Sequence, residues 1–554
     1  MTRSGHNRPA ECGADDAVPE ERPPVEAFGH QESKLPVEPR REEDWRAQSW
    51  KGMDPSSSEV LRATRVHCAL QGFGRPFRKA RGQQFFHLSC PTQTYDEFWS
   101  HSWQTAAWKK ILFLAIVNRG LPACTIATLI SLPVVAMWLL KLLPRLYMDD
   151  VYHSSWCMHF GLLTALGIVA CWRPQKSVFL DRICIRQDDE HHKTEGLAGL
   201  GAVLQRSEAL LVCWDRTYAE RLFCVFELAS FLRFHPDSHV SVLEIKPVML
   251  GYVALSIAAF SYLLALAFIT LPFASSTAAW AAAAVLSFLE GAFLMSVFRD
   301  FFRSLEAAKD QLKRFSLEKA ACHCCTVGHV NPHTKEPLMC DRQFIRQCVA
   351  SWYGSVDNFE RCVQLSATQA LYQQLGVHAF PYHWMLGSTI PCLWAVMDSI
   401  ATYLISPHQH GFVYFWGIRG VAAWLWIWPS LLIYIFFASR CTAAKGKTRF
   451  RELLKSLLVS CAALPFCILA LAWQLATQYL SQLMSFHFTG APSSLVCDIA
   501  ASLVFAAGAL LLFVTVRRFL QFKPLLADRV QTAGVQDVVD VISAGVERGG
   551  ESAT

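Results

Sequence analysis

Long apolar runs separated by short polar links dominate the hydropathy pattern of this 554-residue chain. A helix needs about 20 apolar residues to cross a hydrocarbon core of ~30 Å. Eight runs meet or approach this length, at 121–143, 158–172, 247–273, 278–298, 380–405, 412–437, 454–480 and 494–520. The second run is short, so a buried core helix is the alternative to a span there. The pattern predicts a polytopic α-helical membrane protein with about eight spans.

A different pattern, of short apolar runs alternating with helix-like stretches, fills residues 178–245. An apolar run ends at Asp181, a polar loop follows, and the next elements are expected at 196–206 (helix), 209–214 (strand), 218–228 (helix) and 240–245 (strand). Strands that alternate with helices are typical of a parallel sheet with crossover helices. We therefore expect an α/β domain within the membrane protein.

Composition indicates which partners the chain can have and whether its cysteines are reduced. Hydrophobic residues make up 53% of the chain, more than in a typical soluble domain, so the lipid bilayer is the expected surrounding of the long runs. The net charge of +6 is too small to indicate a nucleic-acid partner. The 20 cysteines are scattered, which favours reduced thiols over a disulfide framework. Residues 1–57 are charged and proline-rich and are expected to be disordered.

Basic residues in the polar links predict the orientation of the spans. The link after the sixth run carries Arg440, Lys445, Lys447, Arg449 and Arg451, whereas the links after the third, fifth and seventh runs carry neither Lys nor Arg. Cytosolic loops are the ones enriched in Lys and Arg. An arrangement of eight spans with both termini in the cytosol places nearly every basic link on the cytosolic side. The sequence does not indicate which membrane this is.

Two stretches of the α/β region resemble a TIR (Toll/interleukin-1 receptor-like) domain. Residues 95–103 (YDEFWSHSW) are similar to the first strand of that family, with Glu97 in place of an apolar residue. Phe179-Leu-Asp181, the strand 210–214, Tyr218 and the helix 223–228 (FCVFEL) are similar to its later motifs, with Phe for Trp and Asp215 where Ser is common. The resemblance implies a flavodoxin-like parallel sheet. A fifth strand is not visible after residue 245, so the domain is truncated or completed from elsewhere.

This resemblance and the apolar runs together predict the domain order. The TIR-like domain occupies 85–118 and 173–246, and a transmembrane hairpin at 119–172 interrupts it. A second hairpin at 247–298, a cytosolic helical Cys/His-rich region at 299–378, four transmembrane helices at 379–520 and a cytosolic tail at 521–554 follow. Both halves of the domain can lie in one compartment, because a hairpin crosses the membrane twice.

The resemblance also implies a site. In TIR domains that cleave NAD+, the glutamate matched by Glu227 lies in the nucleotide pocket and helps to stabilise an oxocarbenium-like transition state. The loop 182–195 would cover that pocket, and the expected NAD+-binding residues are Ser100, Trp103, Arg182, Arg186 and Asp188. The alternatives are a purely structural glutamate and a loop that is either a solvated surface or a self-association interface.

Cysteine and histidine gather in the loop around residues 321–340. Four or more of Cys322, Cys324, Cys325, His329, His333 and Cys340 are expected as ligands of a tetrahedral zinc ion. The spacing fits no standard zinc finger, so ordinary reduced thiols are the alternative.

Four charged residues lie inside apolar runs, where charges are costly and often functional: Glu290, Asp398, Arg419 and Asp498. Asp398 and Arg419 are about equally far from the short link between the fifth and sixth runs. We expect them to form an intramembrane ion pair, and a conduction or transport path is the alternative.

The leading hypothesis is a membrane-anchored TIR-like signalling protein that acts by self-association of its domain, with or without NAD+ hydrolysis. Two other classes remain open, a channel or transporter with a regulatory TIR-like domain and a non-catalytic membrane scaffold. Flux that depends on Asp398 or Arg419 favours the former, and clustering without NAD+ loss favours the latter.

Overall fold

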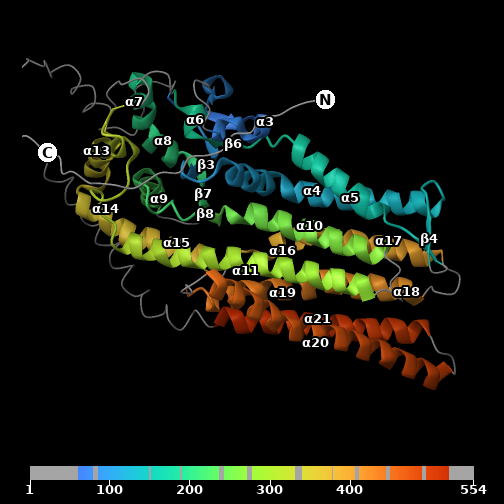
Figure 1. Ribbon diagram of the computed structural model, residues 1–554. Helices are drawn as coiled ribbons and strands as arrows, with labels where there is room; N and C mark the ends of the chain where they lie inside the picture. The colour runs from blue at the N-terminus through green and yellow to red at the C-terminus, as the bar shows by residue number, and fades with distance from the viewer. Residues whose placement is uncertain are drawn as a thin grey trace, which may run out of the picture. The chain divides into compact units, whose positions relative to one another are not determined.

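The structure is a computed structural model. It describes residues 60–78, 85–148, 151–186, 190–235, 242–270, 277–330, 340–376, 379–405, 411–444, 449–489 and 494–522. The predicted N-terminal tail, Asp188, His333 and residues 523–554 of the predicted C-terminal tail lie outside these ranges. The described residues form one six-stranded sheet, a two-stranded hairpin and many helices, several of them long (Figure 1).

The six-stranded sheet is mixed rather than parallel. Its order is β2-β1-β6-β3-β7-β8, and its strands are β1 (Arg62–Arg65), β2 (Cys90–Pro91), β3 (Tyr95–His101), β6 (Ser177–Phe179), β7 (Ser207–Trp214) and β8 (Val242–Pro247). The last four strands in that order are parallel to one another, whereas β1 is antiparallel to both β6 and β2. The sheet therefore includes residues that precede the expected domain start at residue 85.

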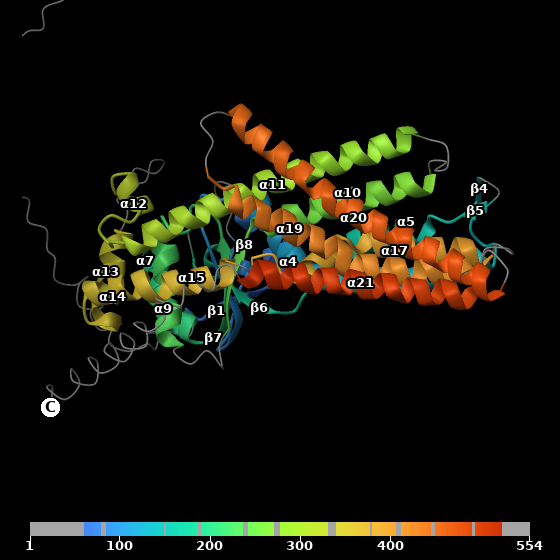
Figure 2. The ribbon, with the colours of Figure 1, turned by 90° about the horizontal axis from the view of Figure 1, so that it is seen from below.

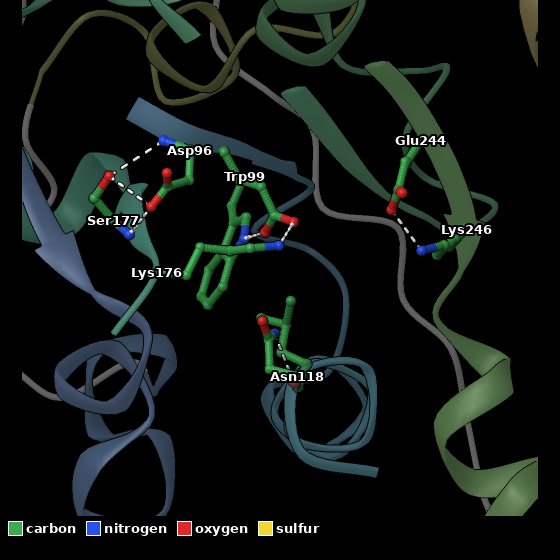
Figure 3. A network of polar contacts seen from close by, with 9 residues as sticks. Asp96, Trp99, Asn118, Lys176, Ser177, Glu244 and Lys246 are labelled. Carbon is green, nitrogen blue, oxygen red and sulfur yellow. Dashed lines mark hydrogen bonds and ion pairs between the residues drawn. The ribbon is translucent and has the colours of Figure 1, made fainter. Parts of the chain in front are cut away.

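Glu97 lies in a central strand of this sheet, and its carboxylate has two polar partners. Strand β3 lies between β6 and β7, and its Glu97 side chain is buried. One carboxylate oxygen accepts a hydrogen bond from Trp99 Nε1 at 2.8 Å, and the other pairs with Lys176 Nζ at 2.6 Å. Figure 3 shows Trp99 and Lys176 in this arrangement. These partners explain how an acidic residue can replace an apolar one in a central strand.

Helices connect the strands with boundaries that differ from the prediction. The expected loop 182–195 is partly helical, because α6 (Asp181–Cys184) and α7 (Glu190–Ala198) fall within it, and α8 (Leu200–Gln205) follows after a break. Helix α9 (Leu222–Phe234) begins later than expected. Tyr218 lies in the preceding turn, where the Asp215 carboxylate accepts hydrogen bonds from Thr217.

A pair of apolar helices follows strand β3 after a short turn. Helix α4 (Ala107–Leu139) is continuous, although the first part of the α/β domain was expected to end at residue 118 and a separate span to begin at residue 121. It continues through Pro122 and Pro133 while packing against α10 (Met249–Thr270) and α5 (Trp156–Cys171). A small hairpin, β4 (Leu146–Met148) with β5 (Val151–His153), joins α4 to α5.

The crossing of α4 and α10 is unusually close. A Cβ atom at Gly251 would lie 2.7 Å from the backbone of Phe113, so only glycine permits this approach. Helix α10 starts immediately after β8, as α4 follows β3. The carboxyl ends of these two strands therefore lead straight into apolar helices.

Most of the remaining apolar helices lie alongside these, as both views show (Figures 1 and 2). They are α11 (Thr277–Lys313), α16 (Tyr382–Ser388), α17 (Ile390–Leu404), a continuous helical stretch 411–441, α20 (Arg449–Thr489) and α21 (Leu495–Phe522). The stretch 411–441 comprises α18 (Gly411–Tyr414), the π-helical segments η4 (Phe415–Gly420) and η5 (Ala423–Ile427), and α19 (Trp428–Cys441). Helix α11 merges the expected span 278–298 with the helix expected after it.

Four described helices are long and apolar enough to cross a membrane: Ala107–Leu139, Met249–Ala267, Phe415–Cys441 and Leu495–Arg518. Helices α5 and α17 are shorter and apolar. Leu121, Leu163 and Leu511 are each at least 66% exposed, so these helices present bare apolar surface. Leu163 belongs to α5, which is therefore not a buried core helix. Continuous exposed apolar surface of this kind marks a membrane or protein contact.

The outer edge of β8 is covered by a helix instead of a fifth strand. The region after the Cys/His loop contains α13 (Asp341–Tyr353), α14 (Val356–Cys362), the π-helical segment η3 (Val363–Ala367) and α15 (Thr368–Leu375). The Gln374 side chain accepts a hydrogen bond from Ile245 N and donates one to Leu243 O. These bonds satisfy edge groups that a fifth strand would otherwise pair.

Candidate active site

The parallel strands place the candidate site at a topological switch point. The chain leaves β3, returns as β6 on one side of it, and then crosses to β7 on the other side. In open α/β sheets, ligands bind beyond the carboxyl ends of strands at such a reversal. Ser100 lies near the end of β3 and Asp181 follows β6.

Glu227 reaches this point from the second turn of α9. Its Oε2 atom lies 2.5 Å from Ser100 Oγ, and Ser100 Oγ lies 2.7 Å from the Tyr218 hydroxyl. Tyr218 in turn donates to the carbonyl oxygen of Cys224 at 2.9 Å. A protonated Glu227 can donate to Ser100 and Ser100 to Tyr218, so the chain of donors and acceptors is complete when the acid is neutral.

The surroundings of Glu227 favour that neutral form. Burial, opposed by the hydrogen bond from Ser100 and reinforced by the nearby Asp181 carboxylate, raises the pKa of Glu227 to about 8. Burial also raises the pKa of Asp181. Carboxylic acids whose pKa is shifted toward neutrality by burial and a neighbouring acid are characteristic of active sites.

Trp103 is connected to the Glu227 site by a hydrogen bond to Asp181. The indole Nε1 of Trp103 donates to Asp181 Oδ2 at 2.8 Å, and the backbone N–H of Arg182 donates to the other oxygen at 2.7 Å. Lys110 Nζ lies 4.7 Å from the Trp103 ring centroid and donates to the Ser102 carbonyl at 3.0 Å. The site thus combines two acids, a buried cation and an aromatic ring.

The predicted site residues divide into two sets. Ser100 and Trp103 lie with Glu227 and Asp181, as described above. Arg182 borders the site, because its guanidinium lies 5.8 Å from the Trp103 ring centroid, but it also donates to the carbonyl of Arg78 and lies 5.5 Å from the Phe85 ring centroid. Arg186 lies over the Phe86 ring at 5.6 Å. Arg182 therefore links the Trp103 side of the site to Arg78 and Phe85, whereas the Arg186 guanidinium contacts Phe86.

Two contributors to the site were not predicted. Asp181 and Tyr218 appeared in the sequence only as parts of strand and turn motifs. An acidic residue directly after a strand of a parallel sheet was the available signal for Asp181, because such positions converge at one edge. Tyr218 gave no comparable signal, since its role depends on how the turn folds onto Ser100.

The predicted zinc ligands do come together. Cys324, Cys325, His329 and Cys340 place one ligand atom each within 4.8 Å of all the others. Cys322 belongs to a second group, with Cys324 and Asp341.

The intramembrane ion pair between Asp398 and Arg419 was wrongly predicted. Asp398 accepts hydrogen bonds from Ser154 Oγ, Cys157 N and Met158 N, at the start of α5. The Arg419 guanidinium donates instead to groups of α20 and α21, namely Gln474 O, Thr477 Oγ1 and Ser502 Oγ. Helix α17 and segment η4 contact each other, but the two side chains bond to different neighbours, Asp398 to the start of α5 and Arg419 to α20 and α21.

The other two charges in apolar helices also have hydroxyl partners. Glu290 accepts a hydrogen bond from Ser256 at 3.0 Å, and Asp498 accepts one from Ser481 at 2.6 Å. These contacts favour structural roles over a conduction path.

No protein-family model matches the chain, and no curated protein or solved structure is significantly similar to it.

Proposed function

We propose that this chain is a multi-pass membrane protein whose TIR-like domain cleaves NAD+ with Glu227 as the catalytic carboxylate. The observation that carries the proposal is the position of Glu227 at the switch point of the sheet, beside Ser100 and Asp181. The sequence motifs that resemble TIR domains supply the expected substrate, and the geometry supplies a carboxyl group suited to glycosidic cleavage.

The proposed reaction breaks the bond between the nicotinamide nitrogen and C1′ of its ribose. Nicotinamide leaves with the bonding electrons, and a positive charge develops on the ribose ring. Ionised Glu227 stabilises this charge, as a carboxylate does in glycoside cleavage. Water then adds to C1′ and releases one proton, so the products are nicotinamide, ADP-ribose and a proton.

Glu227 must lose its proton to act in this way. With a pKa of about 8, it is mostly neutral at pH 7. The nicotinamide ring of NAD+ carries a positive charge, which favours the ionised carboxyl group when the substrate binds. Glu227 is therefore mostly protonated in the free protein at pH 7 and becomes ionised when the positively charged substrate binds.

We also propose eight spans with both termini and the TIR-like domain in the cytosol. Four long apolar helices and the exposed leucines of α4, α5 and α21 support insertion in a lipid bilayer. The basic link 440–451 supports the orientation. Tethering restricts the domain to a surface, where we propose that self-association assembles it for signalling.

The test is nicotinamide release from NAD+ by the purified full-length protein in liposomes, at several protein densities. We expect release that depends on Glu227, with turnover per molecule rising as density rises. Glu227→Gln removes the charge while keeping the size, and Glu208→Gln is the matched control, because Glu208 is exposed near the start of β7.

Loss of release in Glu227→Gln but not in Glu208→Gln supports cleavage by this site. An absence of release at every density overturns NAD+ cleavage. Turnover per molecule that does not change with density overturns activation by self-association and leaves cleavage standing.

A further inference from the structure

The loop after α11 gathers four soft ligands from three short pieces of chain. Cys324 and Cys325 lie on α12 (His323–Thr326), His329 follows in a turn, and Cys340 is the N-cap of α13. Cys324 is buried, Cys325 and Cys340 are partly buried, and His329 is exposed. This arrangement is separate from the Glu227 site and does not depend on the proposed function.

The three distances from the Cys325 sulfur to the other ligand atoms match the edges of a zinc tetrahedron, and all four atoms lie within 4.8 Å of one another. Zinc bonds of about 2.3 Å to sulfur and about 2.0 Å to nitrogen require S···S edges of about 3.8 Å and S···N edges of about 3.5 Å. The Cys325 sulfur lies 3.8 Å from that of Cys324, 3.9 Å from that of Cys340 and 3.5 Å from His329 Nε2. None of the sulfurs is in a disulfide, so all three can act as thiolates.

The surrounding backbone holds these ligands in place. The N–H of Asp341 donates to the Cys324 sulfur at 3.2 Å, a contact that stabilises a metal-bound thiolate. His329 has a positive φ of 57°, which is uncommon for a residue with a side chain. Its N–H donates to Cys324 O at 2.8 Å, which tightens the turn that carries the imidazole.

We propose that Cys324, Cys325, His329 and Cys340 bind a structural zinc ion. Three thiolates and one imidazole select zinc over hard cations such as Mg²⁺ and Ca²⁺. All four positions of the tetrahedron are filled by side chains, so the site is closed and has no place for a substrate. Cys322 is not a ligand, because its sulfur lies only 3.2 Å from that of Cys324, shorter than a tetrahedral edge.

The zinc ion fixes the start of α9. Residue Ala321, immediately before the cluster, forms a parallel bridge with Arg221. Its N–H donates to Glu220 O at 2.9 Å, and its carbonyl accepts from Leu222 N at 3.1 Å. Leu222 is the first residue of α9, so an ordered metal loop holds the first turn of the helix that carries Glu227.

The experiment measures zinc in the full-length protein purified in detergent without chelators. We expect roughly one zinc ion per chain in the unmodified protein, and at least a tenfold loss in Cys325→Ser and in Cys340→Ser. Cys322→Ser is the matched control and retains zinc. Cys325→His also retains zinc, because imidazole replaces thiolate as a ligand, which separates ligand loss from misfolding.

Two further readouts need no enzymatic activity. Cobalt loaded in place of zinc gives the visible absorption of a tetrahedral thiolate site, and this absorption is absent in Cys325→Ser. Hydrogen exchange of the Ala321 and Leu222 amides becomes faster in Cys325→Ser than in Cys322→Ser. Zinc-free unmodified protein, equal zinc in all variants, or a disulfide among these cysteines overturns the proposal.

Discussion

Glu227 at the sheet and Asp398 among the apolar helices are both carboxyl groups surrounded by protein, but their partners differ. Asp398 accepts three hydrogen bonds, two of them from the free N–H groups at the start of α5. Glu227 accepts one, from Ser100, and lies beside a second acid. Asp398 therefore caps a helix, whereas Glu227 keeps a proton that it can release.

The same difference separates a structural charge from a reactive one. Backbone N–H groups at a helix start are fixed donors, and they stabilise an acid in one position. A carboxyl group with a single hydroxyl partner and a pKa near neutrality can change its charge when a ligand binds.

Removing the Asp398 carboxylate should have the largest effect on folding. Asp398→Ala leaves Ser154 Oγ, Cys157 N and Met158 N without their acceptor, and buried donors left unpaired are costly. We expect a loss of roughly 3 kcal/mol in the free energy of unfolding. Denaturant titration in detergent micelles checks this, with Asp498→Ala as a control that loses one hydrogen bond, from Ser481, instead of three. Equal losses in the two variants would show that the cap of α5 is unimportant.

Activity should rise with pH because the ionised form of Glu227 is the active one. Burial raises its pKa to about 8, so the carboxylate fraction falls about tenfold for each pH unit below that value. We expect kcat/KM for NAD+ to rise from pH 6 and to level off above pH of about 8, since kcat/KM reports the free protein. A profile that falls across this range would assign the neutral acid as the active form.

The neighbours of Glu227 should move this profile in opposite directions. Asp181→Asn removes a negative charge that raises the pKa of Glu227, so the midpoint of the kcat/KM profile should move to lower pH. Ser100→Ala removes the hydrogen bond that lowers that pKa, so its midpoint should move to higher pH. Shifts of the same sign in both variants would mean that the profile reports another group.

Gln374 should have the smallest effect. Gln374→Ala exposes Ile245 N and Leu243 O at the edge of β8, and we expect a loss of about 1 kcal/mol in the free energy of unfolding. Hydrogen exchange at Ile245 should quicken, while exchange in the central strand β3 stays unchanged. Unchanged exchange at Ile245 would indicate that water or another group covers this edge as well as the glutamine does.

Part of the α/β domain was predictable from sequence because its strands are short apolar runs. The runs that became β6, β7 and β8 were each placed within a few residues, and so was β3, despite Glu97. Strand β1 was missed, because a four-residue RATR segment has neither apolar periodicity nor a turn signal. Helix α4 was predicted as two elements because the α/β domain was expected to end at residue 118, whereas the helix is continuous and packs on α5 and α10.

The sites show the same limit. The cysteine and histidine cluster was predictable, because its ligands are close in sequence. The Asp398–Arg419 pair was not, since equal spacing from a link sets depth along two helices but not the faces they present. Arg419 lies within the π-helical segment η4, whose turns do not follow the periodicity of an α-helix. The roles of Asp181 and Tyr218 could be recognised only in the folded structure, because they contact Trp103 and Ser100 from distant parts of the chain.

One crossed measurement tests the contrast between the two acids most directly. Nicotinamide release and thermal unfolding are measured side by side for the unmodified protein, Glu227→Gln and Asp398→Asn. The account predicts that Glu227→Gln loses at least about 100-fold in turnover and unfolds at the same or a higher temperature. Asp398→Asn should unfold at a lower temperature and keep its turnover per folded molecule. Turnover that survives in Glu227→Gln, or that is lost in folded Asp398→Asn, would contradict the assignment of the reactive acid.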